Sequence, residues 1–245
     1  MPRFLPLALL AVLMAGSAHS LDLSLGAAMT VSTSPYKGHD ATYLPAPLVR
    51  YEGEHAYIRN TSLGVYVFKR EKHKIGVGVS YFGMHFDPDD TDDIQMKQLN
   101  DRRSTMMADV SYEAITKFGI AKLKVSGDVL GKSNGFIVDA GFQVPFIRER
   151  YIIMPGVGVR WNSRKQADYY FGVSPEEALR SGLDAFTGKS NFTPYVKLEG
   201  KFDLSAHWSV VGGVYADFLT GGARKSPMTE REVTFGGALG LQYAF

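Results

Sequence analysis

The chain lacks cysteine, carries little net charge, and has no long apolar run after its first twenty residues. The absence of cysteine excludes a disulfide framework and also the lipidated cysteine of a bacterial lipoprotein. A net charge of +2 on 245 residues gives no indication of nucleic acid or a polyanion as partner. No later stretch reaches the roughly 20 apolar residues of a membrane helix. The fold must therefore form without covalent cross-links or helical membrane spans.

The first twenty residues have the pattern of a secretory signal peptide. Arg3 precedes an apolar run over 4–15, and the small residues Ala18 and Ser20 stand at the expected cleavage positions. We therefore predict a cleaved signal peptide at 1–20 and a single mature domain at 21–245.

The last stretch, 230–245, alternates between two kinds of side chain. One set is largely apolar or aromatic and consists of Val233, Phe235, Gly237, Leu239, Leu241, Tyr243 and Phe245. The residues between them are small or polar, and the run ends on a carboxy-terminal phenylalanine, as last strands of outer-membrane barrels usually do. This pattern predicts a membrane-spanning strand.

The same two-residue period recurs along most of the chain. It predicts strands at 22–31, 45–52, 54–60, 62–69, 74–83, 103–114, 119–130, 135–144, 150–161, 191–203, 207–218 and 231–245. These make about twelve strands, an even number that suits a bacterial single-chain barrel. Ten is the alternative, because three short strands crowd into 45–69. The predicted fold class is an all-β, transmembrane, antiparallel β-barrel.

Short and long connections alternate along the chain. Short links fall near 70–73, 116–118, 145–149 and 204–206, and long segments at 32–44, 84–102, 162–190 and 219–230. Outer-membrane barrels place short turns in the periplasm and long loops outside. The sequence therefore predicts a protein that lies in the outer membrane of a Gram-negative bacterium and contacts its lipid and lipopolysaccharide. Both termini are expected on the periplasmic side.

Charged residues occupy many of the predicted inward positions. They include Asp109, Glu113, Lys122, Lys124, Asp128, Asp139, Arg160, Lys197, Glu199, Lys201 and Asp217. Both signs are interspersed, and the two acids of 103–114 can approach Lys122 and Lys124 across a hairpin. A lumen braced by ion pairs is favoured over a narrow polar conduit, because about twelve strands leave a modest interior.

Two long loops have distinct chemistry. The acidic run FDPDDTDD at 86–93 offers oxygen ligands but lacks the glycine and glutamate of an EF-hand, which favours a solvated loop over a calcium site. Ser174 and Pro175 predict the N-terminus of a short helix over 175–180. The histidines are scattered without a recognisable nucleophile. We therefore predict no catalytic residue, cofactor or metal, and a lipid-active barrel hydrolase is the least favoured alternative.

Several short motifs, in order, resemble those of one family. They are SPYKG at 34–38, SLGVYVF at 62–68, EKHKIGVGVSY at 71–81, YYFGVSPEEA at 169–178 and ARKSPMTERE at 223–232. With them the mature chain resembles the MipA/OmpV family of outer-membrane proteins, also called MltA-interacting proteins. The resemblance implies a non-enzymatic scaffold or adaptor that links a lytic murein transglycosylase to a penicillin-binding protein. A small channel, or a pore related to solutes or antibiotics, is the alternative.

Two candidate contact surfaces follow, one from the matched motifs and one from the predicted short turns. Recognition outside the cell would use tyrosines and cations of the long loops, namely Tyr36, Tyr169, Tyr170, Arg224 and Lys225, unless these tyrosines pack the loops over the barrel. A murein-enzyme partner would instead need a periplasmic turn, and the candidates there are Phe146, Arg148, Glu149 and Arg150. Gly38, Gly172 and Pro227 are expected to shape loop turns.

Overall fold

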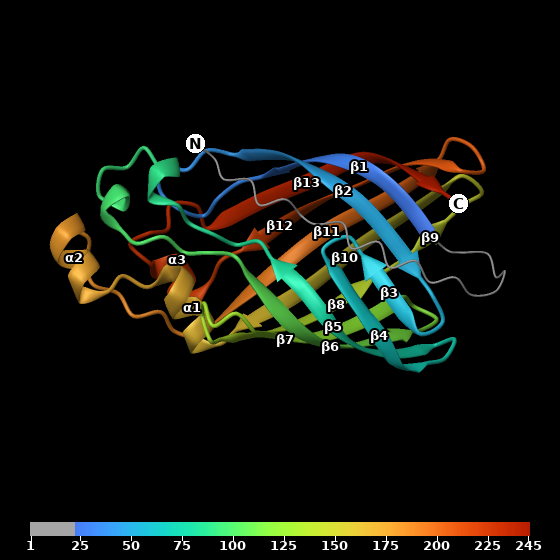
Figure 1. The fold of residues 1–245 in the computed structure, drawn as a ribbon, viewed down its shortest axis with the longest axis horizontal. Helices are drawn as coiled ribbons and strands as arrows, with labels where there is room; N and C mark the ends of the chain where they lie inside the picture. Colours follow the sequence, from blue (N-terminus) through green and yellow to red (C-terminus); the bar gives the residue numbers. More distant parts are fainter. Residues whose placement is uncertain (1–22) are drawn as a thin grey trace.

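The computed structural model describes residues 23–245 as a closed antiparallel β-barrel with loops gathered at one end (Figure 1). The predicted signal peptide at 1–20 lies outside the described residues. The barrel strands are β1 (Leu23–Ser32), β2 (Thr42–Glu52), β3 (Ala56–Arg59), β4 (Ser62–Lys69), β5 (His73–Phe82), β6 (Thr105–Ile115), β7 (Ile120–Asp128), β8 (Phe136–Gln143), β10 (Tyr151–Asn162), β11 (Asn191–Asp203), β12 (Trp208–Phe218) and β13 (Val233–Ala244).

Twelve strands form the ring within 23–245. The sheet has thirteen, but the short β9 (Phe146–Ile147) pairs only with the start of β10. Consecutive strands pair around the barrel, and β1 closes it against β13. The prediction of about twelve antiparallel strands is confirmed. The ten-strand alternative is wrong, because β3, although it has four residues, pairs with both β2 and β4.

The outer wall carries the apolar set of the alternation. On β13, the side chains of Phe235 and Leu239 are more than half exposed. Thr234, which precedes Phe235 and points to the other face of the strand, is buried. Val157 on β10 and Val214 on β12 are likewise exposed. Apolar side chains that face outward all round a closed sheet suit contact with lipid. No helix among the described residues is long and apolar enough to cross a membrane.

The connections divide the barrel into two ends. At the turn end, the links at 70–72, 116–119, 144–150 and 204–207 are short. At the loop end, the long segments 33–41, 83–104, 163–190 and 219–232 contain α1 (Arg164–Phe171), α2 (Pro175–Ser181), α3 (Gly221–Lys225) and two short 3₁₀ helices, η1 (Pro88–Asp90) and η2 (Met96–Gln98). The predicted helix at 175–180 is therefore found as α2.

Candidate functional site

The four long loops share one hydrophobic core at the loop end. We call it the cap core; it consists of Tyr36, Phe86, Met96, Leu99, Tyr170, Phe171, Val173, Leu183, Ala223 and Met228, all buried. These residues come from the β1–β2, β5–β6, β10–β11 and β12–β13 connections, which leave the barrel at points spread around the ring. A core that they share has to lie across the mouth of the barrel at the loop end, where Figure 1 shows the loops gathered.

Two of the tyrosines predicted for external recognition lie inside the cap core. Tyr36 is fully buried, and its hydroxyl donates to the carbonyl of Tyr170 at 3.0 Å. Tyr170 is 1% exposed and donates to the carbonyl of Arg103 at 2.9 Å. Burial raises the pKa of both phenols. Their burial agrees with the alternative in which these tyrosines pack the loops over the barrel, because apolar contacts between loops withdraw both rings from water.

The other external candidates lie nearer the surface. The Tyr169 ring packs edge-on against Tyr170, with 4.8 Å between ring centroids, and its hydroxyl accepts from the Arg103 N–H at 2.9 Å. Arg224 is exposed on α3 and forms an ion pair with Glu232 at 2.6 Å. Lys225, its neighbour at the end of α3, is also exposed. The five candidates are therefore divided between the cap core and its surface.

A buried ion pair fastens α2 to the β5–β6 loop. The Arg102 guanidinium donates to both carboxylate oxygens of Glu177, at 2.9 and 3.0 Å. Glu177 also closes the capping box with Ser174 and accepts from the Asn100 N–H at 2.8 Å. Burial alone raises the pKa of Glu177, but the N–H donors of Ser174 and Asn100, with Arg102, hold that pKa below its usual value.

The acidic run at 86–93 has a structural role. Asp87 caps η1 by accepting from the Asp89 N–H at 3.0 Å, and Asp93 accepts from the N–H groups of Gln95 and Met96. Gly38 of the facing loop has φ +65°, and a Cβ there would lie 2.6 Å from Thr91 Oγ1. No group of three potential metal ligands forms within 23–245. The carboxylates therefore hold the loop shape that lets Gly38 approach.

The predicted lumen charges are largely paired with one another. Glu113 lies 3.8 Å from Lys122 and 3.6 Å from Lys74, and Asp109 lies 3.8 Å from Lys124. The β6–β7 register brings these groups together, because it sets Glu113 opposite Lys122. Lys197 pairs with Glu199 at 3.2 Å, and Lys201 pairs with Asp203 at 3.0 Å.

Arg160 of β10 joins two nearby strands on the inner wall. It pairs with Asp139 of β8 at 3.2 Å and with Asp217 of β12 at 2.9 Å. Tyr195 of β11 donates to Asp139 at 2.9 Å, and the guanidinium lies 4.9 Å from the centre of its ring. Asp128 differs from the other lumen candidates, because it accepts from Thr105, Leu130, Ser133 and Asn134 and so organises the β7–β8 loop.

A second ionic cluster, which the sequence reasoning missed, lies toward the turn end. Glu52 at the end of β2 pairs with Arg59 at 3.0 Å and Lys74 at 3.3 Å, and the Tyr66 hydroxyl donates to it. Its signal in the sequence is weak, because its members come from four different strands, β2 to β5, and meet only in the folded barrel. Because Lys74 also pairs with Glu113 at 3.6 Å, this cluster is joined to the ion pairs on β6 and β7.

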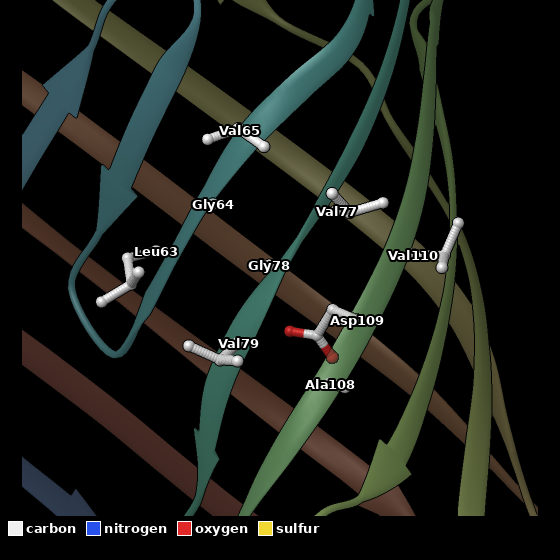
Figure 2. A pocket seen from close by; sticks show the side chains of 9 residues that line it. All are labelled: Leu63, Gly64, Val65, Val77, Gly78, Val79, Ala108, Asp109 and Val110. Atoms are coloured by element: carbon white, nitrogen blue, oxygen red, sulfur yellow. The ribbon is translucent and has the colours of Figure 1, made fainter.

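A shallow hollow of about 520 Å³ lies on the wall over β4, β5 and β6 (Figure 2). Its lining is mainly aliphatic, with Leu63, Val65 and Val110 each more than half exposed. Gly64 and Gly78 contribute no side chain there, and a Cβ at Gly64 would meet the Tyr57 hydroxyl oxygen 2.5 Å away. The hollow belongs to the outer apolar wall and contains no cluster of catalytic groups among the described residues.

The turn end carries the remaining candidates on one exposed surface. Phe146 and Ile147 of β9 are more than half exposed, and Arg148, Glu149 and Arg150 follow in an exposed turn. The neighbouring β6–β7 turn adds Phe118, 71% exposed, with the Lys117 ammonium 4.9 Å from its ring centre. We call residues 117–118 and 146–150 the turn patch. Its exposed apolar and basic side chains are of the kind found in protein interfaces.

Comparison with known proteins gives one consistent family. Residues 25–245 match the protein family described as MltA-interacting protein MipA. The MltA-interacting proteins of Escherichia coli (strain K12) and of Shigella flexneri are each 34% identical to this chain over 244 residues, which are 99% of this chain and 98% of each relative. Among solved structures, the COG4313 outer membrane channel from Pseudomonas putida F1 aligns with 93% of this chain and 97% of its own, at 11% identity and a TM-score of 0.46.

Proposed function

Because the chain belongs to the MltA-interacting protein family, we propose that it is a non-enzymatic scaffold of the bacterial outer membrane that binds a lytic murein transglycosylase. A closed barrel with an apolar outer wall suits that membrane. The observation that carries the proposal is the turn patch, where Phe118, Phe146 and Ile147 are exposed beside Arg148 and Arg150. In barrels of this kind the short turns face the periplasm, where a murein enzyme works.

The chemistry of the turn patch supports a protein partner. Exposed aromatic and arginine side chains are enriched in the energetically important parts of interfaces. Glu149 lies between the two arginines, so the patch combines a positive rim with one acid that sets the orientation of a partner. A penicillin-binding protein as a second, simultaneous partner would make the barrel a bridge between murein hydrolysis and synthesis.

The proposal is tested by measuring the binding of a purified lytic transglycosylase to the full-length barrel in vesicles. The double variant with Arg148→Glu and Arg150→Glu reverses two charges and is expected to bind the transglycosylase several-fold more weakly, because both cations lie in the proposed contact. The matched control is Arg224→Glu with Lys225→Glu, two neighbouring cations at the loop end. Equal binding by both double variants would contradict the proposal, and a ternary complex with a penicillin-binding protein would extend it.

A small channel is the second candidate, and the charged lumen favours it. Against it stand the ion pairs that join Arg160, Glu113 and Glu52 to partners on nearby strands of the lumen wall, and the cap core over the mouth. Planar-bilayer recordings separate the two functions. A braced and capped barrel is expected to give no steady conductance, whereas a pore gives unitary steps that change when Arg160 is replaced by methionine.

A further inference from the structure

The wall of the barrel is incomplete along one edge of β2. β2 pairs with β1 from Leu23↔Tyr51 to Ser32↔Thr42, but with β3 only over Arg50–Glu52. The β3–β4 hairpin turns at Asn60, whose N–H donates to the Val49 carbonyl at 2.8 Å. Figure 1 shows this hairpin ending partway along the barrel while β2 continues toward the loop end. Within 23–245, residues 42–48 have no strand on this side.

Prolines occupy the free edge of β2. Val49 both donates to Asn60 and accepts from it, so its N–H and C=O point toward the hairpin side. Alternate residues of a strand share this direction, which puts Tyr43, Pro45 and Pro47 on the free edge. Proline has no N–H to leave unpaired, and it is confined to strand edges for this reason. Two of the three donors of this edge are therefore absent, and only carbonyls and the Tyr43 N–H remain.

We call the unpaired part of the wall beside residues 42–48 the window, and loops bound it toward the loop end. At the hairpin, the Tyr81 N–H donates to the Thr61 carbonyl at 2.9 Å, and β5 ends just beyond this contact at Phe82, where the β5–β6 loop begins. Above, the β1–β2 and β5–β6 loops join, because Asp92 donates to the Gly38 carbonyl at 3.0 Å and the His39 ring packs 5.2 Å from that of Phe86. The edge itself is about 20 Å long, at roughly 3.3 Å for each of its residues.

The inner wall beside the window is apolar and uncharged. Leu44, Ala46 and Leu48 alternate with the outward Tyr43, Pro45 and Pro47, and their cross-strand neighbours on β1 are Thr30, Ala28 and Gly26. The Leu48 side chain reaches across toward β13, where a Cβ at Gly240 would meet its Cδ1 at 2.8 Å. Leu44 is 52% exposed although it faces inward. This sector contrasts with the ion-paired sectors on β6–β8 and β10–β12.

We propose that this window, bounded by residues 42–48 of β2, the Asn60–Thr61 turn and the end of β5, admits an acyl chain of a surrounding membrane lipid, which contacts Leu44 and Leu48. The outward residues of β2 continue the lipid-facing wall without interruption into the window. An added β-strand from a second copy or another protein would need N–H donors along the edge, and Pro45 and Pro47 remove them. The exposed carbonyls are hydrated from the lumen, since lipid cannot satisfy them.

The proposal is tested by photocrosslinking from inside the window. The full-length barrel is reconstituted in vesicles of dioleoylphosphatidylcholine with a benzophenone side chain at Leu44, and irradiated protein is analysed by intact mass. We expect an adduct of one lipid. The matched control is Val211, a half-buried inward residue of β12 in a fully paired part of the wall. Its lipid adduct is expected to be several-fold weaker. Leu239, outward and 66% exposed, is the positive control.

Three outcomes overturn the proposal. Lipid adducts at Leu44 no stronger than at Val211, with Leu239 labelled, would mean that the window is closed to lipid. A dimer as the main Leu44 product would assign the edge to a second copy. If a benzophenone at Leu48 gives no more lipid adduct than one at Val211, the acyl chain reaches only the rim of the window and does not contact Leu48. Folding of each variant is checked by the difference in gel mobility between unheated and heated samples. None of these outcomes bears on transglycosylase binding.

Discussion

The Arg102 guanidinium holds both carboxylate oxygens of Glu177, at 2.9 and 3.0 Å, in a pair buried between the β5–β6 loop and α2. Arg102 also donates to the Gly172 carbonyl at 3.1 Å, so this pair ties the end of α1 to the same point. Because the loops have little regular pairing of their own, the cohesion of the cap core depends on a few such contacts.

The first prediction concerns the charge of Glu177. Glu177→Gln leaves the Arg102 cation buried without its partner, which costs about 3 kcal/mol. We expect faster proteolysis within 163–190 and 83–104 while the barrel stays folded. Glu176→Gln is the matched control, because Glu176 is the exposed neighbour on the same helix. Equal cleavage of the two variants would show that the ion pair does not hold the cap together.

The second prediction is a pH dependence of the cap. The pKa of Glu177 is lower in the folded protein than in the unfolded chain, so its contribution is fully present above the unfolded pKa and is lost as the pH falls through the folded pKa. Hydrogen exchange of amides in α2, corrected for intrinsic rates, should therefore show falling protection in acid. In Glu177→Gln this dependence should be reduced. Protection that rises on acidification would contradict the prediction.

The third prediction concerns glycines beneath lumen tyrosines. A Cβ at Gly158 would lie 2.3 Å from the Tyr195 ring, which packs over this glycine, and the Tyr195 hydroxyl donates to Asp139. Gly158→Ala should displace the ring and lower the free energy of unfolding by about 1–3 kcal/mol. Gly127→Ala is the control, because a Cβ there meets nothing within 4 Å. Urea unfolding in vesicles measures both; a stable Gly158→Ala would mean that the ring moves freely.

The fourth prediction concerns Arg160. Arg160→Met leaves Asp139 and Asp217 without their shared cation and should lower the unfolding temperature. The free energy of unfolding should fall by about 2–3 kcal/mol, which is at the low end for buried ion pairs because the guanidinium is partly solvated. Lys201→Met is the comparison, since its ion pair with Asp203 is a third exposed and should contribute less than 1 kcal/mol. Similar losses of unfolding free energy in the two variants would show that the ion pairs of Arg160 stabilise the barrel no more than an exposed pair does.

The sequence by itself determined the strand positions and the face that each strand turns outward. Period-two alternation is a local property, and a closed barrel converts it directly into an outer apolar wall and an inner polar one. Short turns also made the β6–β7 register predictable, so Glu113 and Lys122 were expected as neighbours. The Ser174 cap of α2 was readable for the same reason, because capping acts within one turn.

Only the tertiary structure decided what the loops and β3 do. The sequence leaves open whether Tyr36 and Tyr170 face outward or pack the loops, and they are buried because four loops, separated by up to almost two hundred residues, share one core. The hairpin that turns at Asn60 contacts β2 only near its end, which leaves the rest of that edge unpaired. Only then is it clear that Pro45 and Pro47 lie on a free edge of the sheet. Contacts between distant segments have no local period, so these features emerge only when the ring closes.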